Sequence, residues 1–291
     1  MKAHFLKTIA LTTTLLASAI SAVAFAESSV WKVSKGSDHI YIGGTVHILP
    51  VSEFPLPTEF TDAYEASDAI VLEAKLPEPT DITFQTKMMQ KMSYTNGQTL
   101  ATVLSKSTYK QLSDYIATFG ADINTLNGFK PGFIVTMMAM MEAQRAQIAG
   151  DGVDAYFNQL AVKQGKDIAY LESADFQLDM LASMGQGDED SFVKMNLAQM
   201  KDFKTMFDDM LAAWRKGDTA KLEEVVIKPM QEDPKTFKTM IVDRNKNWIP
   251  LIEAMFSDND REFVLVGVGH LIGEDNVISL LKKQGYSVSK L

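Results

Sequence analysis

The chain has 291 residues, of which 46% are hydrophobic and 22% charged, which is typical of a globular protein of one large or two small domains. Its formal net charge of −9 disfavours nucleic acid and anionic membrane surfaces as partners. The sequence contains no cysteine, which excludes disulfides, a thiol nucleophile and thiolate metal ligands.

The first 26 residues have the features of a cleavable signal peptide. Lys2 and Lys7 precede or flank the apolar stretch from Thr8 to Val23, and Ala24-Phe25-Ala26 fits a small-x-small cleavage site. We predict cleavage after Ala26, which would change the formal charge to −11 because it removes two lysines and no acidic residue. An uncleaved membrane anchor is the alternative, but the apolar run is short and rich in Thr and Ser.

The mature chain, residues 27–291, is predicted to be a single domain that is periplasmic or secreted and has no transmembrane segment. It opens with an alternating strand, Val30 to Ser34, and a second strand from Ile40 to His47, which together indicate a β-hairpin. Gly43-Gly44 in the second strand leaves room for close approach of backbone or ligand. Pro50 cannot donate to a ladder, so the strand should end near His47.

Two further apolar strands end in ionisable residues. After a helix from about Thr58 to Ala66, the run Ala69 to Leu72 ends at Glu73, and its continuous apolar character indicates a strand covered on both faces. Near the C-terminus, Phe263 to His270 repeats the Gly-x-x-His ending of the strand from Ile40 to His47. A helix from Asn276 to Gln284 and a strand over 286–288 should close the chain.

The segment between these strands, about residues 81–250, is predominantly helical in composition and in the spacing of its apolar residues. Predicted helices cover residues 81–92, 107–119, 132–148, 153–164, 176–184, 189–216, 219–226 and 234–255, and a short strand covers Asp167 to Glu172. We therefore predict an α/β fold, with a mixed central sheet built from N- and C-terminal Gly-x-x-His halves. A helical insertion, about 81–250, should cap the carboxyl edge of the sheet, where open α/β sheets bind ligands.

The strand ends carry the candidate chemistry. His47, His270 and Glu73, with Glu172 near them, would form a His/carboxylate set suited to one divalent ion with an open position for water. Such an ion activates water without a serine or cysteine nucleophile. Each histidine could instead be a satisfied, partly buried polar side chain, and Glu73 could cap a helix or pair with Arg244. Nitrogen and oxygen ligands leave zinc and manganese equally open.

The sequence also contains 17 methionines, several of them clustered at 88–92 and 137–141. These could supply thioether ligands for Cu(I). Methionine is more often a flexible filler of cores and of adaptable binding surfaces, and a Met-lined groove could hold an extended peptide.

Taken together, the motifs resemble the TraB/GumN family, which includes the Tiki metalloproteases. The resemblance rests on residues 41–50, Val71 to Glu73, Gly152 to Asp154, Leu171-Glu172 with Gln177, Arg244 to Trp248, and Val266 to Gly273. It implies an α/β fold with two Gly-x-x-His motifs facing one site. In the Tiki branch it also implies metal-dependent proteolysis, with manganese or cobalt favoured over zinc.

The resemblance assigns residues as well as a fold. It implies His47, His270 and Glu73 as metal ligands, and Arg244 with Asn247 as a catalytic pair. Arg244 would bind a substrate carboxylate or an oxyanion, or alternatively hold the helical cap to the sheet through an ion pair. Glu172 would orient a ligand or act as a general base, or else be an ordinary carboxylate at a strand end.

Two functions follow as expectations. The first is an exported metal-dependent hydrolase, most simply a peptidase acting on a peptide or protein substrate. The second is a non-catalytic periplasmic binding protein that sequesters a peptide or a haem-like tetrapyrrole, which needs the pocket but no activated water.

Overall fold

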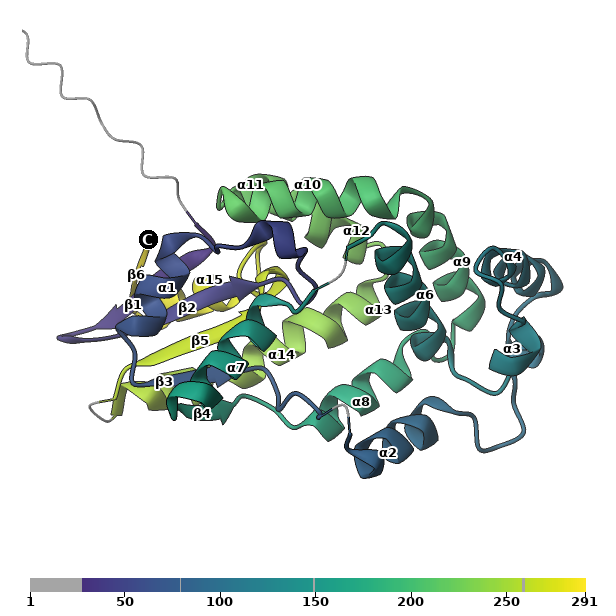
Figure 1. Cartoon of the computed structure of the whole chain (residues 1–291), viewed down its shortest axis with the longest axis horizontal. Coiled ribbons are helices and arrows are strands. Elements are labelled where there is room, and N and C mark those ends of the chain that lie inside the picture. The colour runs from purple at the N-terminus through teal and green to yellow at the C-terminus, as the bar shows by residue number, and fades with distance from the viewer. Residues whose placement is uncertain (1–27, 79, 149, 258–259) are drawn as a thin grey trace, which may run out of the picture.

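The computed structural model describes residues 28–78, 80–148, 150–257 and 260–291 (Figure 1). The predicted signal peptide, residues 1–26, lies outside the described residues. Six strands are described: β1 Val30–Lys35, β2 Asp38–Thr45, β3 Ala69–Leu72, β4 Asp167–Tyr170, β5 Glu262–Gly267 and β6 Ser287–Lys290.

The strands form one mixed sheet in the order β4-β3-β5-β2-β1-β6. The four strands from β4 to β2 are parallel, whereas β1 pairs antiparallel with both β2 and β6. This confirms the predicted α/β class and the predicted hairpin of β1 and β2. The sheet draws on both ends of the chain, but β4 comes from the predominantly helical middle segment.

Helices surround the sheet and extend beyond it. The α-helices are α1 Thr58–Glu65, α2 Ile82–Met92, α3 Leu100–Val103, α4 Lys106–Ala117, α5 Ile123–Leu126, α6 Pro131–Arg145, α7 Val153–Gln164, α8 Ala174–Ser183, α9 Glu189–Gln199, α10 Phe203–Arg215, α11 Thr219–Leu222, α12 Lys228–Met230, α13 Pro234–Phe237, α14 Asp243–Ala254 and α15 Val277–Lys283. Two π-helical turns, η3 Glu223–Ile227 and η4 Lys238–Val242, continue α11 and α13. No helix among the described residues is both long and apolar enough to cross a membrane.

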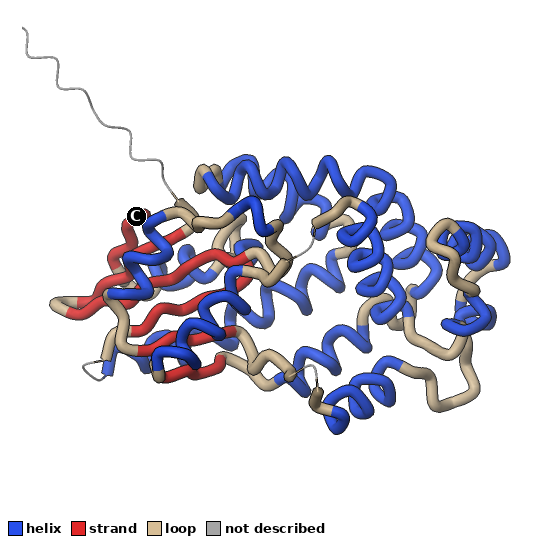
Figure 2. The backbone as a smooth tube through the Cα atoms, in the orientation of Figure 1, coloured by secondary structure: helices blue, strands red, loops and turns tan. Residues whose placement is uncertain are grey.

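Helices lie on both faces of the sheet (Figure 2), and each face has its own core. One face packs against α1, α7 and α10 through large aromatic side chains, Phe60, Phe157 and Trp214. The other packs against α14 and α15, where Trp248 and Leu281 are buried. Burial of the central strands on both faces explains why β3 and β5 are continuous apolar runs.

A third core holds the helices that lie beyond the sheet. It contains buried side chains from α4, α6 and α9, such as Leu112, Ile134 and Val193. In Figure 1 these helices lie beyond the carboxyl ends of the parallel strands, and β6 and the turn between β1 and β2 lie at the opposite end of the molecule. The helical middle segment therefore has a core of its own next to the sheet.

The structure interrupts one helix that the sequence predicts as continuous and places a π-helical turn inside another. The predicted helix over 189–216 consists of α9 and α10 with a 3₁₀ turn, Met200–Asp202, between them. Met200 in this turn is buried in the helical core. No Gly or Pro marks the turn in the sequence, so it was not predicted. The predicted helix over 234–255 contains the π-helical turn η4.

Candidate functional site

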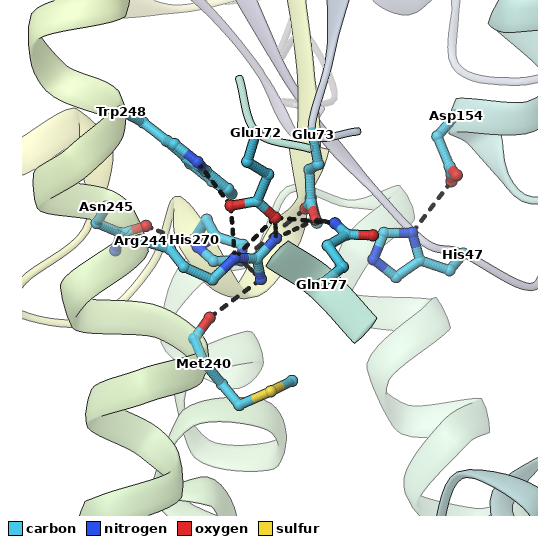
Figure 3. Close-up of polar contacts among 11 residues, drawn as sticks. His47, Glu73, Asp154, Glu172, Gln177, Met240, Arg244, Asn245, Trp248 and His270 are labelled. Carbon is cyan, nitrogen blue, oxygen red and sulfur yellow. Dashed lines mark hydrogen bonds and ion pairs between the residues drawn. The ribbon is translucent and has the colours of Figure 1, made fainter. Parts of the chain in front are cut away.

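Three neighbouring strands end at one place, and each is followed by a predicted site residue. Glu73 follows β3 directly, His270 is the last residue of the 3₁₀ turn that follows β5, and His47 comes two residues after β2. Because β3, β5 and β2 are adjacent and parallel, their carboxyl ends meet at the same edge of the sheet. Figure 3 shows these side chains together with Asp154, Glu172, Gln177 and Arg244.

His47 is oriented by the carboxylate of Asp154. Its Nδ1 lies 3.2 Å from Asp154 Oδ1, so Nδ1 carries the donated proton and Nε2 is left for the site. The start of α7 is docked on this strand end, because Val153 N donates to Val46 O and a Cβ on Gly152 would lie 2.4 Å from His47 O. Partial loss of solvation opposes charge on His47, although its side chain is still 60% exposed. The hydrogen bond to Asp154 and the charges of Asp154 and Glu73 outweigh this and raise the pKa of His47 to about 9.

His270 has the same tautomer but a different environment. Its Nδ1 lies 2.6 Å from Asn245 Oδ1, and the Asn245 amide donates in turn to Asp275 O. His270 Nε2 therefore accepts, and Arg244 Nη1 lies 3.0 Å from it. The ring packs on Trp248 with centroids 4.4 Å apart. Burial and the charges of Arg244 and His47 lower the pKa of His270 to about 3, against the opposing effect of Glu73.

Glu73 is an ionised, nearly buried carboxylate. Its Oε1 accepts from Gly267 N at 2.7 Å, and its Oε2 lies 2.5 Å from Arg244 Nη2. Burial alone would raise its pKa, but the neighbouring His270, Arg244 and His47 and the Gly267 N–H hold the pKa of Glu73 at about 2. The carboxylate is therefore charged at every physiological pH.

Arg244 is the centre of the buried network. Its Nε donates to Glu172, its Nη1 to Met240 O and His270 Nε2, and its Nη2 to Glu73 and Glu172. These contacts engage all five N–H donors of a guanidinium. The Glu172 carboxylate also accepts from Trp248 Nε1 and Gln177 Nε2. This arrangement favours the structural role of Arg244, an ion pair that holds α14 to the sheet.

A cavity of about 430 Å³ opens beside this network. It is lined by His47, Glu73, Asp154 and Gln177 and, on its apolar side, by Met140 of α6. Gly267 keeps the space between the two ionisable groups free, because a Cβ there would lie 3.2 Å from His47 Nε2 and 3.3 Å from Glu73 Oε1. The site therefore presents an imidazole and a carboxylate together at an open wall.

The nitrogen and oxygen atoms of these side chains are only in part arranged to bind a divalent ion. Nitrogen and oxygen ligands are the right type, and both histidines have Nδ1 held by an oxygen acceptor, as metal-binding histidines do. His270 Nε2, however, faces the Arg244 guanidinium, and it lies 3.9 Å from Glu73 Oε1. Within the described residues, no group of three His, Asp or Glu side chains is arranged to hold a metal ion. His47 Nε2 and Glu73 Oε1 are the donors left facing the cavity.

The structure brings together five of the six predicted site residues, and it places the sixth elsewhere. Asn247 is exposed on α14, whose inward-facing positions are Arg244, Asn245, Trp248, Ile249 and Ile252. The asparagine in the network is Asn245. Its spacing of three residues from Trp248 was the sequence signal that could have selected it.

The roles of Asp154 and Gln177 were also not predicted. Both belong to the motifs that carry the family resemblance, but their contacts to His47, Glu73 and Glu172 join residues 104 or more positions apart or depend on the start of α8. The third described histidine, His39, lies in the hairpin against Tyr41, and the candidate copper ligands Met137 and Met138 pack in the helical core.

The pKa values of the two histidines should be shifted in opposite directions from the usual value for histidine. In metal-free protein, we expect the His47 imidazole to titrate near pH 9 and His270 to remain neutral down to about pH 3. Asp154→Asn should lower the pKa of His47, because it removes the carboxylate that stabilises the imidazolium. The ring proton resonances in an NMR titration, assigned with His47→Ala, report both values. A His47 midpoint at or below 6.5 would contradict the assignment.

Comparison with known proteins adds a family. Residues 29–290 match the model of the TraB/PrgY/gumN family. Metalloprotease TIKI2 of Danio rerio is 20% identical over an alignment that covers 85% of this chain and 57% of TIKI2, so the chain spans little more than half of that relative. The uncharacterized protein YbaP of Escherichia coli is 24% identical, with 85% of this chain and 89% of YbaP covered, and YbaP of Shigella flexneri matches equally. No solved structure matches the chain. Because the family model matches almost the whole described chain, the protein belongs to the TraB/PrgY/gumN family.

Proposed function

We propose that the chain is an exported hydrolase that cleaves peptide bonds in a peptide or protein substrate at the cavity beside His47 and Glu73. The observation that carries the proposal is the pairing of His47 Nε2 and Glu73 Oε1 on either side of the space left open by Gly267. The distant relative named as a metalloprotease supports the same reaction class.

The chain's own residues divide the work. Asp154 fixes the His47 ring so that Nε2 is directed at the cavity, and the Gly267 N–H and Arg244 fix the two oxygens of Glu73. Arg244 has no N–H left for a substrate oxyanion in this arrangement, so we assign it a positioning role. Glu172 acts through Arg244, Gln177 and Trp248, as an orienter of the network.

The proposed cofactor is a divalent ion, with manganese or cobalt preferred to zinc, held by His47 Nε2 and Glu73 Oε1. When bound, such an ion lowers the pKa of a coordinated water to about 7. Without it, His47 is protonated at neutral pH and has no lone pair to accept a proton from water. Two protein donors hold an ion less firmly than the three of ordinary catalytic sites, so a chelator should remove it readily.

The test is hydrolysis of a mixed peptide library by protein that lacks residues 1–26. The protein is stripped with a chelator and then resupplied with Mn²⁺, Co²⁺ or Zn²⁺ in turn, while ion binding is measured separately by calorimetry. We expect cleavage to be lost on stripping and restored with Mn²⁺ or Co²⁺. Folded protein that binds no ion and cleaves nothing would overturn the proposal.

A second candidate function is favoured by one observation. Because every N–H of Arg244 is engaged by the protein, the buried cation offers nothing to a developing oxyanion, which suits a non-catalytic binder of a peptide or a haem-like ligand. The same experiment separates the two candidates. A binder would retain one ligand per chain, release no product, and respond neither to chelator nor to added ion.

A further inference from the structure

We propose that a second cavity, between α8–α9 and α12–α13–η4, is a substrate subsite that takes an apolar side chain next to a basic residue of a bound peptide. The inference rests on the proposed function and deepens it, because it names the class of peptide. The cavity has a volume of about 490 Å³, within the range of about 300–1,000 Å³ that is usual for ligand sites.

The walls of this cavity are apolar and adaptable. Met184, Phe192, Met195 and Met240 line it. Methionine side chains are unbranched and polarizable, so they can repack around apolar groups of different shape. An apolar side chain of a peptide would therefore fit without a single fixed shape being required.

Two elements, η4 and α8, extend from this cavity to the site. Met240 lines the second cavity, and its backbone carbonyl accepts a hydrogen bond from Arg244 Nη1 at 3.1 Å. Figure 3 shows Met240 on the Arg244 side of the network. Met240 belongs to the π-helical turn η4, and such turns are frequent at functional sites.

Helix α8 supplies the second connection and a distance. Gln177 lines the cavity beside His47, and Ser183 at the end of the same helix lines the second cavity. Six residues of α-helix rise about 9 Å, which is the length of about three residues of extended peptide. The apolar side chain should therefore lie about three positions from the bond that is cleaved.

The charge of the lining selects a basic neighbour. Asp188, Glu232 and Asp233 contribute three carboxylates, against one ammonium from Lys235. Lys235 Nζ donates to Gln186 O, and the Asp233 carboxylate caps α13 by accepting from Lys235 N and Thr236 N. Glu232 lines the cavity and is exposed, so it can attract a lysine or arginine side chain.

The experiment measures binding separately from turnover. His47→Ala protein, which should not consume peptide, is titrated with three dye-labelled ten-residue Gly/Ser peptides that carry Lys-Leu-Lys, Glu-Leu-Glu or Lys-Ser-Lys at the centre. We expect the Lys-Leu-Lys peptide to bind at least tenfold more tightly than the other two. Adding Ser191→Trp, which places a large ring at the cavity wall, should weaken its binding at least tenfold.

A charge reversal gives the matched comparison. Glu232→Lys should weaken binding of the Lys-Leu-Lys peptide about two- to fivefold and strengthen binding of the Glu-Leu-Glu peptide. Glu65→Lys, the same change in charge on α1 at the sheet, should leave both unchanged.

The outcomes also separate this proposal from the proposed hydrolase. Equal binding of the three peptides by a protein whose wild-type form cleaves the library would overturn the subsite and leave the hydrolase standing. Glu232-dependent binding of the Lys-Leu-Lys peptide, with no cleavage under any ion, would support the subsite and overturn the hydrolase. Cleavage products with an apolar residue about three positions from the cut would support both.

Discussion

Arg244→Met should lower the free energy of unfolding by about 3–5 kcal/mol, the cost of removing one partner from a buried ion pair. The Arg244 side chain is only 4% exposed, and the carboxylates of Glu73 and Glu172 are nearly as buried. Methionine fills much of the same volume but leaves both carboxylates without their cation. Their remaining donors, such as Gln177 and Trp248 for Glu172, do not neutralise charge.

Urea denaturation measures this loss, and two variants calibrate it. Arg244→Lys keeps the charge but not the planar five-donor fork, so it should be less destabilising than Arg244→Met. Arg215→Met breaks the ion pair to Glu53 at a site where the Arg215 side chain is 39% exposed, and should cost no more than about 1 kcal/mol. If Arg244→Met costs no more than Arg215→Met, the network does not hold α14 to the sheet.

The edge of the sheet where the site lies could be predicted because its strands are apolar runs that end abruptly in ionisable residues. His47, Glu73 and His270 each follow such a run. Parallel strands place successive carboxyl ends side by side, so three separate segments were expected to converge there, and they do.

The side chains that support these residues could not be predicted from the same pattern. Asn245, not Asn247, enters the network, because Asn245 lies on the buried face of α14 with Arg244 and Trp248, whereas Asn247 is exposed. Asp154 reaches His47 only because the start of α7 docks on the end of β2. The contact of Asp154 leaves no periodic signal in the sequence, whereas the i, i+3 spacing of Asn245 and Trp248 does.

The engagement of all five N–H groups of Arg244 also depends on tertiary contacts that the sequence does not show. The sequence shows an arginine near the site and leaves open whether it serves the substrate or the fold. Its five donors meet partners from four separate segments: Glu73 after β3, Glu172 after β4, Met240 in η4 and His270 after β5. Only the assembled sheet edge decides between the two roles.

His47→Ala should reduce peptide hydrolysis at least about 10²-fold, because the proposed ion would lose one of its two protein ligands and with it the water that it activates. The same change should abolish ion binding, because it removes one of the two donors that face the cavity. The His47 side chain is 60% exposed, so solvent screens its contacts and the loss in the free energy of unfolding should be smaller than for Arg244→Met. Library hydrolysis, calorimetric ion binding and urea denaturation on one preparation measure all three.

His39→Ala is the matched control, since it removes another imidazole that lies in the hairpin against Tyr41 and should alter neither hydrolysis nor ion binding. Asp154→Asn should reduce hydrolysis less than His47→Ala, because it keeps the imidazole and weakens only its orientation. Undiminished hydrolysis by a folded His47→Ala protein would remove His47 from the chemistry. Glu73 would then be left as the ionisable side chain beside the space at Gly267. With a pKa of about 2, its carboxylate is too weak a base to activate water unaided.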